Sequence, residues 1–316
     1  MHAKTPSEKI YCLISDRLRL LVKNGMNIRL FASICNAFSK CLPLLSIPCF
    51  PCLKFILFVM LLQYKKYGLG KPAVIILHGL MGSSKNWHKI GTELKKSYPS
   101  LIPDLRNHGE SFHGIHSISA MRNDITALLD SLSLDKIHLI GHSMGGMVAM
   151  MLAADFPGRV ESLTVVDIAP EANIKNTLPI FNPLISLDLT TIRRKDDADS
   201  LLSETIPEKS VRHFLLQNLK RQEDGDYGWQ CNLPELYKFL QDNDKFMLNP
   251  DAVYNGATLF IGGGKSNHNL PAHKKIISHH FPNHQLAMIE DVGHWVHFEA
   301  PAEFLNLLTN FLAQEN

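Results

Sequence analysis

Residues 137–146 read IHLIGHSMGG, with Gly141-His142-Ser143-Met144-Gly145 at the centre of the stretch. The apolar run at 137–140 predicts a strand, and the small and apolar residues at 144–154 predict a helix close to a sheet. A serine between them occupies a tight, strained turn, and the flanking glycines leave room for the neighbouring backbone. The pattern predicts Ser143 as a nucleophile, with the free N–H groups of the helix facing any negative charge that develops there.

Short apolar runs alternate with helical patterns on both sides of this motif. Such alternation is typical of βαβ units, whose right-handed crossovers place helices on both faces of a mostly parallel sheet. We therefore expect an α/β fold with a core formed by residues 70–170 and 257–316. The expected strands are 73–77, 100–103, 137–140, 160–168, 257–261 and 285–289, and the expected helices are 118–132, 144–154, 272–280 and 302–312.

The alternation stops between residues 171 and 256. This segment is richer in charged residues and predicts short helices at 197–204, 210–219 and 234–240, with a turn signal at 223–226. We interpret it as a helical cap inserted over the carboxyl ends of the strands, where α/β proteins bind their ligands.

A serine hydroxyl is a poor nucleophile and needs a base. Of the 16 histidines, His294 follows the last expected strand and precedes the last helix, so it lies at the same end of the sheet as Ser143. His297 is the rival, but it falls where the helix begins, and we expect it to pack. His294 is the expected general base.

The acid that orients the base is expected between serine and histidine in chain order. The loop after the expected strand 257–261 reads GGGKSNHN and holds no carboxylate. Asp167 ends an apolar strand, where a carboxylate is costly unless it is paired, and a histidine loop beside it would supply the partner. Asp167 is therefore the expected acid, with Glu235 in the cap and Asp291 as weaker rivals.

The oxyanion of an acyl-transfer reaction needs backbone donors. One is expected from Met144, the residue after the nucleophile, and the other from Leu80 in the loop His78-Gly-Leu-Met-Gly82. Gly79 gives the backbone room, and His78 shapes the loop. We place His78, Gly79 and His142 at the substrate-binding site.

The stretch DLRNHGES at 104–111 follows another expected strand. It could be an anion-binding loop, but an Asp- and Gly-dependent turn tied to its neighbours by Arg106 is the reading we favour.

The composition is that of a globular protein, with 45% hydrophobic and 20% charged residues in 316. The net charge is +2, and residues 1–40 hold seven basic and two acidic residues, so the rest is mildly acidic. This distribution disfavours a nucleic-acid binder. Five of the six cysteines lie in the first 52 residues, so the core folds without disulfides, as in a reducing compartment or an organelle matrix. No zinc-site pattern is present, and no metal or organic cofactor is implied.

Residues 1–69 form a leader with a different character. Apolar residues recur at helical spacing from 10 to 22 among basic ones, which is typical of a mitochondrial presequence. Glu8 and Asp16 count against this interpretation, because such presequences contain few acidic residues. Residues 41–63 form an apolar run nearly long enough to cross a bilayer, interrupted by three prolines and a lysine, so a membrane anchor is the alternative. An unstructured extension is the third reading. The end of the run, at 55–64, also fits the first strand of the domain.

Four stretches taken together resemble the α/β-hydrolase family: His78-Gly79, the Arg106-Asn-His-Gly109 loop, GHSMGG at 141–146 and GHWVH at 293–297. The resemblance runs from about residue 71 to the C-terminus and is closest to a branch that contains animal abhydrolase-domain proteins and small bacterial esterases. It implies an ester or thioester hydrolase, a mitochondrial location for animal members, and an acid at the position of Asp167. Some family descriptions place the acid in the cap, where this chain reads Asn232-Leu-Pro-Glu-Leu236.

We therefore expect a serine hydrolase that cleaves carboxylic esters, with lipid acyl esters or thioesters as substrates, through a Ser-His-Asp triad and an acyl-enzyme. A membrane-anchored lipase or acyltransferase is the first alternative. The second is a non-catalytic ligand-binding module on the same fold, although such a module has no need of a base. Epoxide and haloalkane hydrolases are disfavoured, because they need Asp where Ser143 stands.

Overall fold

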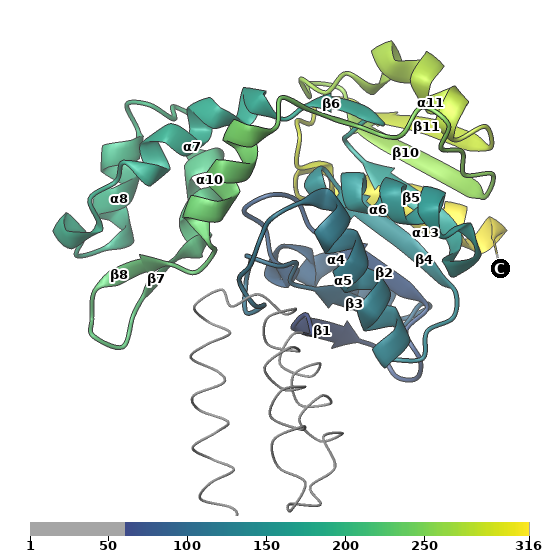
Figure 1. The fold of residues 1–316 in the computed structure, drawn as a ribbon, viewed down its shortest axis with the longest axis horizontal. Coiled ribbons are helices and arrows are strands. Elements are labelled where there is room, and N and C mark those ends of the chain that lie inside the picture. The colour runs from purple at the N-terminus through teal and green to yellow at the C-terminus, as the bar shows by residue number, and fades with distance from the viewer. Residues whose placement is uncertain (1–60, 316) are drawn as a thin grey trace, which may run out of the picture. The chain divides into compact units, whose positions relative to one another are not determined.

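The computed structural model describes residues 61–315, so the expectations for residues 1–60 lie outside it. Seven strands form one sheet in the order β1-β3-β2-β4-β5-β10-β11, and every pair from β3 to β11 is parallel (Figure 1). This confirms the mostly parallel α/β sheet. The strands are β1 (Tyr64–Tyr67), β2 (Val74–Leu77), β3 (Ser100–Pro103), β4 (Ile137–His142), β5 (Val160–Val166), β10 (Ala257–Gly263) and β11 (His284–Ile289).

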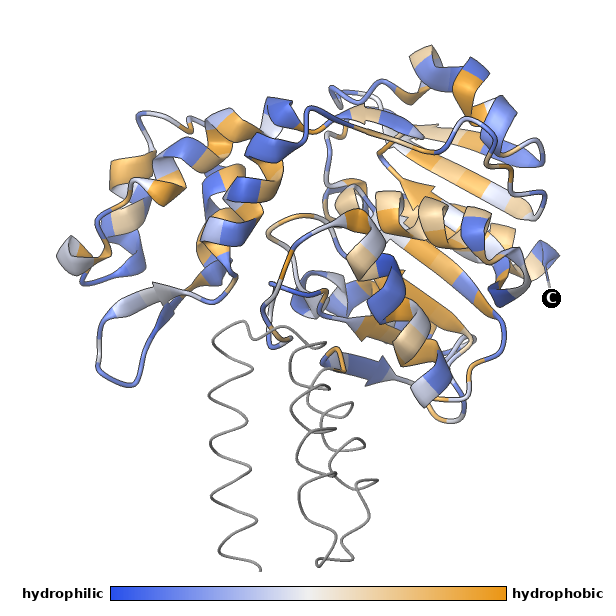
Figure 2. Cartoon of the chain, viewed as in Figure 1, coloured by the Kyte–Doolittle hydropathy of each residue, from blue (hydrophilic) through white to orange (hydrophobic). Residues whose placement is uncertain are grey.

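Residues 55–60 of the expected first strand at 55–64 lie outside the described residues, and strand β1 begins at Tyr64. β1 reads YKKY, is largely exposed, and pairs antiparallel with β3 at the edge of the sheet. Hydropathy colouring shows it blue against the orange central strands (Figure 2). An edge strand with lysines has no buried face to produce an apolar run, which is why hydrophobicity does not reveal it.

Helices cover both faces of the sheet. Val74, Ile76 and Ile140 belong to one apolar cluster with α4 (His88–Leu94), α12 (Val296–Glu299) and α13 (Pro301–Gln314). Because strand side chains alternate, their neighbours point to the other face, where α5 (Ile118–Ser131) and α6 (Met144–Asp155) pack. Gly146 of α6 is so close to Ile168 that an added Cβ would lie 2.5 Å from its side chain. The expected helices at 118–132, 144–154, 272–280 and 302–312 correspond to α5, α6, α11 (Lys274–His280) and α13. The short helix α4 was not foreseen.

The segment 171–256 is helical but also contains two small antiparallel pairs. Its helices are α7 (Leu178–Ile185), α8 (Lys195–Leu202), α9 (Lys209–Leu215) and α10 (Leu233–Asp242), and its strands are β6 (Glu171–Asn173), β7 (Leu219–Arg221), β8 (Tyr227–Trp229) and β9 (Lys245–Met247). The expected helix 210–219 is too long, because the chain turns at 216–218 and enters β7. The turn signal at 223–226 joins β7 to β8, with Gly225 at φ +92°. We refer to 171–256 below as the cap segment.

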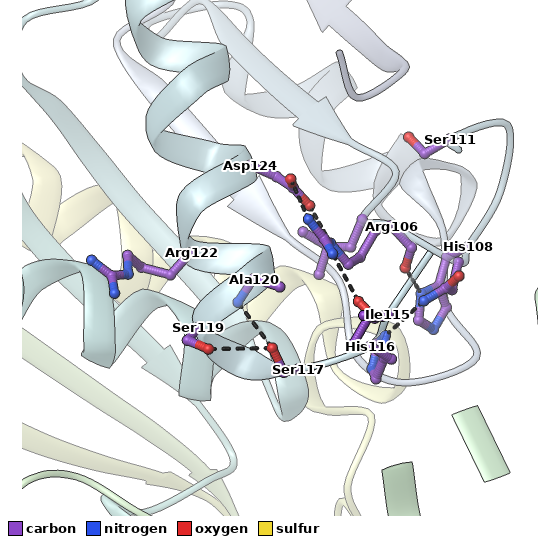
Figure 3. Close-up of polar contacts among 12 residues, drawn as sticks. Arg106, His108, Ser111, Ile115, His116, Ser117, Ser119, Ala120, Arg122 and Asp124 are labelled. Atoms are coloured by element: carbon purple, nitrogen blue, oxygen red, sulfur yellow. Dashed lines mark hydrogen bonds and ion pairs between the residues drawn. The ribbon is translucent and has the colours of Figure 1, made fainter. Parts of the chain in front are cut away.

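The loop after β3 is the structural turn that the sequence favoured. Arg106 forms a two-pronged ion pair with Asp124 of α5, with Nη2 2.6 Å from Oδ1, and its Nη1 donates to the carbonyl of Ile115 (Figure 3). Asp104 accepts from the backbone N–H groups of Ser84 and Glu110. The guanidinium of Arg106 is thus engaged in contacts within the protein.

No helix between residues 61 and 315 combines the length and the apolar character that crossing a bilayer requires.

Candidate active site

Ser143 occupies the sharp turn between β4 and α6. Its backbone has φ 52° and ψ −118°, a strained conformation for a residue with a side chain. A Cβ at Gly141 would lie 2.3 Å from the carbonyl oxygen of Gly145, and one at Gly145 would lie 2.5 Å from that of Leu77. Both flanking glycines are therefore required by close backbone contacts, as the motif predicted.

His294 and Asp167 meet at the same end of the sheet. Nδ1 of His294 lies 2.7 Å from Oδ2 of Asp167, and the carboxylate is 1% exposed whereas the ring is 26% exposed. Asp167 directly follows β5, and its φ of 51° turns the chain away from the sheet. Glu299 holds the histidine loop by accepting from the backbone N–H groups of Gly293 and Trp295. The structure thus brings the expected base and acid together.

The rival acids lie elsewhere. Glu235 accepts a hydrogen bond from the backbone N–H of His116, at 3.0 Å. Asp291 is 88% exposed and forms an ion pair with Lys265. Neither contacts His294 by a hydrogen bond, whereas Asp167 does.

The end of β10 and the loop after it support Asp167, although that loop contains no carboxylate. The backbone N–H of Gly263 donates to Oδ1 of Asp167 at 2.9 Å, and the hydroxyl of Ser266 donates to Oδ2. The ring of His268 lies beside that of His294, tilted by 36°, with the ring centroids 4.7 Å apart. Sequence reasoning missed Ser266 and His268, because it examined this loop only for an acid.

The loop from His78 to Gly82 lies against Ser143. A Cβ on Gly79 would lie 2.8 Å from Nδ1 of His142 and 3.3 Å from Cβ of Ser143, so this position needs glycine. Met81, at φ 60°, donates its N–H to Nε2 of His108 and accepts from the side chain of Asn218. A core residue and a residue of the cap segment therefore fix the loop that carries Leu80.

His78 is fully buried and holds the loop from within. Its Nδ1 bonds the carbonyl of Gly79 at 2.8 Å, and its Nε2 accepts from the N–H of Leu105 at 2.9 Å. His142 is also buried, and its Nε2 lies 2.9 Å from the carbonyl oxygen of His294. His142 and Gly79 line a cavity of about 890 Å³ that Ser143 and His294 also line, whereas His78 does not.

The imidazoles around His294 are held neutral. Burial, reinforced by His294, lowers the pKa of His268 to about 4 and that of His297 to about 3. Burial and the same neighbour hold the pKa of His142 well below its usual range. His297 stacks on Trp87 with ring centroids 3.9 Å apart, which is the packing role expected for it.

Within residues 61–315, one group of side chains lies close enough to hold a cation: Asp167, His268 and His294, whose ligand atoms are within 4.8 Å of one another. Oδ2 of Asp167 is already bonded to His294 and to Ser266. The same carboxylate oxygen thus already accepts hydrogen bonds from two side chains of the protein.

A cavity of about 890 Å³ opens above Ser143, His294, Leu80 and Met144. Its walls come from the core and from the cap segment and are largely apolar, including Met147, Ile180, Phe181, Val211, Phe239 and Leu240. The apolar part of such a cavity suits an apolar chain.

A family model described as "alpha/beta hydrolase fold" matches residues 72–301. The chain belongs to the α/β-hydrolase family. It is 37% identical over 254 residues to a mouse (Mus musculus) protein named sn-1-specific diacylglycerol lipase ABHD11, covering 77% of this chain and 81% of that one. Esterase YbfF of Escherichia coli is 29% identical over 244 residues, covering 76% and 92% of the two chains.

A solved structure of a marine microorganism esterase superimposes with a TM-score of 0.76 at 33% identity, covering 80% of this chain and 99% of that one. These α/β-hydrolase relatives are named as a lipase and as esterases, and the chain is accordingly a carboxylic ester hydrolase.

Proposed function

We propose that this α/β hydrolase cleaves acyl esters with Ser143 as nucleophile, His294 as general base and acid, and Asp167 as the group that orients His294. The observation that carries the proposal is the 2.7 Å contact between Nδ1 of His294 and Oδ2 of Asp167 beside the cavity that Ser143 lines. With Nδ1 bonded to Asp167, Nε2 is the nitrogen left to exchange a proton with the serine.

The proposed reaction has two halves. Oγ of Ser143 attacks the carbonyl carbon while His294 takes the hydroxyl proton, and the N–H groups of Leu80 and Met144 stabilise the oxyanion. Met144 opens α6, so its N–H has no partner inside the helix. The ester C–O bond then breaks, the leaving alcohol takes the proton from His294, and an acyl-enzyme remains. Water attacks it, giving its proton to His294, and the carboxylic acid leaves as Ser143 regains a proton.

The proposed substrates are esters with an apolar acyl chain, including lipid acyl esters and thioesters. The apolar walls of the cavity support this class. The diacylglycerol lipase name of the mouse relative supports a lipid ester in particular.

We propose a mitochondrial location on the pattern of residues 10–22, with an anchor at 41–63 as the alternative. Import into isolated mitochondria with cleavage of the leader would support a presequence. Retention of the uncleaved chain in carbonate-washed membranes would support the anchor.

The proposal is tested by replacing two serines that have the same backbone φ, one lining the cavity and one outside it. Ser143→Ala should abolish hydrolysis of p-nitrophenyl butyrate. Ser133 also has a φ of 52° but lies exposed outside the cavity, so Ser133→Ala should retain wild-type turnover. Turnover by Ser143→Ala near the wild-type rate would refute the nucleophile assignment.

A further inference from the structure

Asp167, His268 and His294 form a compact group of metal-binding side chains. One ligand atom from each side chain lies within 4.8 Å of the other two, and this is the one such group among residues 61–315. In a tetrahedral zinc site, bond lengths of about 2.0–2.1 Å place the ligand atoms roughly 3.4 Å apart. The three side chains therefore need to approach one another by roughly 1.4 Å at most to surround one ion.

The imidazole of His268 is available to such an ion. It lines the cavity of about 890 Å³ together with His294. The backbone N–H of His268 donates to Oγ of Ser266, but none of the described residues bonds to its ring nitrogens. His268 lies in a loop between exposed Asn267 and Asn269, where a side chain can shift without disturbing the core. An ion that enters the cavity therefore meets an unpaired imidazole beside His294.

The carboxylate of Asp167 retains room for one more bond. Its Oδ2 accepts from His294 and Ser266, and its Oδ1 accepts from the backbone N–H of Gly263. Because a carboxylate offers about four acceptor positions, these three bonds leave one. Ser266 and Gly263 also fix the orientation of the carboxylate, as the hydrogen-bond partners of metal ligands do.

The chemistry of the three side chains favours zinc. Imidazole nitrogens and carboxylate oxygens are common ligands of Zn²⁺, and three protein ligands with a water in the fourth position form a recurrent zinc site. Mg²⁺ and Ca²⁺ prefer sites built from oxygen ligands, so two imidazoles suit them poorly.

We propose that Zn²⁺ binds reversibly to Asp167, His268 and His294, the zinc group, and inhibits the hydrolase. Coordination through Nδ1 of His294 replaces the hydrogen bond to Asp167 and releases the Nδ1 proton to water. Coordination through Nε2 instead occupies the nitrogen that exchanges a proton with Ser143. In either arrangement His294 no longer serves as the proposed base. The inhibition rests on the proposed function, whereas the binding of the ion does not.

The test measures zinc binding and zinc inhibition in the full chain. Competition with a chromophoric chelator gives the Zn²⁺ affinity, and hydrolysis of p-nitrophenyl butyrate is followed at the same free Zn²⁺ concentrations. His268→Gln should weaken binding and inhibition by at least about tenfold, because loss of even an outer partner of a metal ligand weakens affinity roughly 10- to 100-fold. Each rate is expressed relative to the rate of the same variant without zinc.

Three further variants make the result specific to the zinc group. His273→Gln removes another histidine that lines the cavity but lies outside the group, and it should keep wild-type inhibition. His268→Cys supplies a different zinc ligand and should retain binding. Ser143→Ala should bind zinc as the wild-type protein does, although it hydrolyses no ester. The cysteines within residues 1–60 are common to the wild-type protein and every variant, so their own zinc binding cancels in these comparisons.

Equal zinc affinity and equal inhibition in His268→Gln and the wild-type protein would overturn the proposal. So would zinc binding that depends on His268 but leaves hydrolysis unchanged, or inhibition by Mg²⁺ as strong as that by Zn²⁺. If the wild-type protein hydrolyses no ester but binds zinc through His268, the proposed function fails and the zinc group stands. If His268→Gln does not fold, His268→Asn takes its place in the same measurements.

Discussion

Nδ1 of His294 lies 2.7 Å from Oδ2 of Asp167, although the two residues are 127 positions apart in the chain. The sheet brings them together, because Asp167 follows β5 and His294 follows β11, and β10 lies between these two parallel strands. A buried carboxylate bonded to one ring nitrogen holds an imidazole in one orientation.

Replacement of this carboxylate should cost activity without changing the fold. Asp167→Asn should lower kcat for p-nitrophenyl butyrate by about 10³- to 10⁴-fold, because an amide can hold the imidazole in the wrong tautomer. Asp291→Asn removes an exposed carboxylate that pairs with Lys265. Because exposed ion pairs contribute little free energy, the kcat of this variant should stay within about twofold of the wild-type value. If Glu235→Gln loses as much activity as Asp167→Asn, the result would indicate that the acid of the triad lies in the cap segment.

Ser266 takes the place in the loop after β10 where a carboxylate was sought, and its hydroxyl donates to Oδ2 of Asp167. We expect Ser266→Ala to lower kcat about tenfold, since a hydrogen bond to a charged group contributes roughly 1.5–3 kcal/mol. Ser266→Thr keeps the hydroxyl and should restore most of the rate. Equal rates for Ser266→Ala and wild type would show that Gly263 and His294 alone position the carboxylate.

The cap segment contributes to the proposed oxyanion loop through Asn218, whose Nδ2 lies 2.6 Å from the carbonyl oxygen of Met81. Asn218→Ala frees that carbonyl and should lower kcat about tenfold with a smaller change in KM, since the loop stabilises charge that appears only in the transition state. Tyr237→Phe removes an exposed bond between Tyr237 and Asn182 within the cap segment and is the matched control. A change in KM alone would assign Asn218 to substrate binding.

Stability should fall as the solution becomes acidic. His116 and His297 are buried, and burial lowers the pKa of each to about 3. An unfolded imidazole titrates near ~6.5, so between about pH 6.5 and 3 the unfolded chain binds more protons, and the free energy of unfolding decreases as pH falls. Each ring contributes about 1.4 kcal/mol per pH unit across that window.

Urea unfolding at pH 7.5 and pH 5.5 measures this effect. His297→Phe keeps an aromatic ring against Trp87 and removes one titrating group, so its loss of stability between the two pH values should be smaller than that of wild type. An identical loss in both proteins would mean that His297 has a similar pKa in the folded and unfolded chains.

Local patterns were enough to predict the central elements and to select Ser143, His294 and Asp167 as candidate site residues. The turn at Ser143 has a steric requirement that the flanking glycines reveal, and β2 and β4 are buried along their whole length, so they read as apolar runs. Asp167 was found because a carboxylate at the end of an apolar strand needs a partner. Each of these signals lies within a few residues of sequence.

The parts that sequence reasoning missed depend on contacts between distant segments. Ser266 reaches Asp167 across 99 residues, and Asn218 reaches Met81 across 137. A serine or an asparagine in a polar loop has no local feature that identifies such a partner. Residues 65–67 of β1 were not expected as a strand for a related reason, since it is the pairing with β3 that makes the exposed YKKY stretch a strand.

Peptide mapping by mass spectrometry after reaction with a fluorophosphonate tests the central assignment most directly. We predict a single phosphonylated residue, Ser143, in the wild-type protein, and no labelling of the Ser143→Ala variant. Label on another residue, with Ser143 recovered unmodified, would contradict the account.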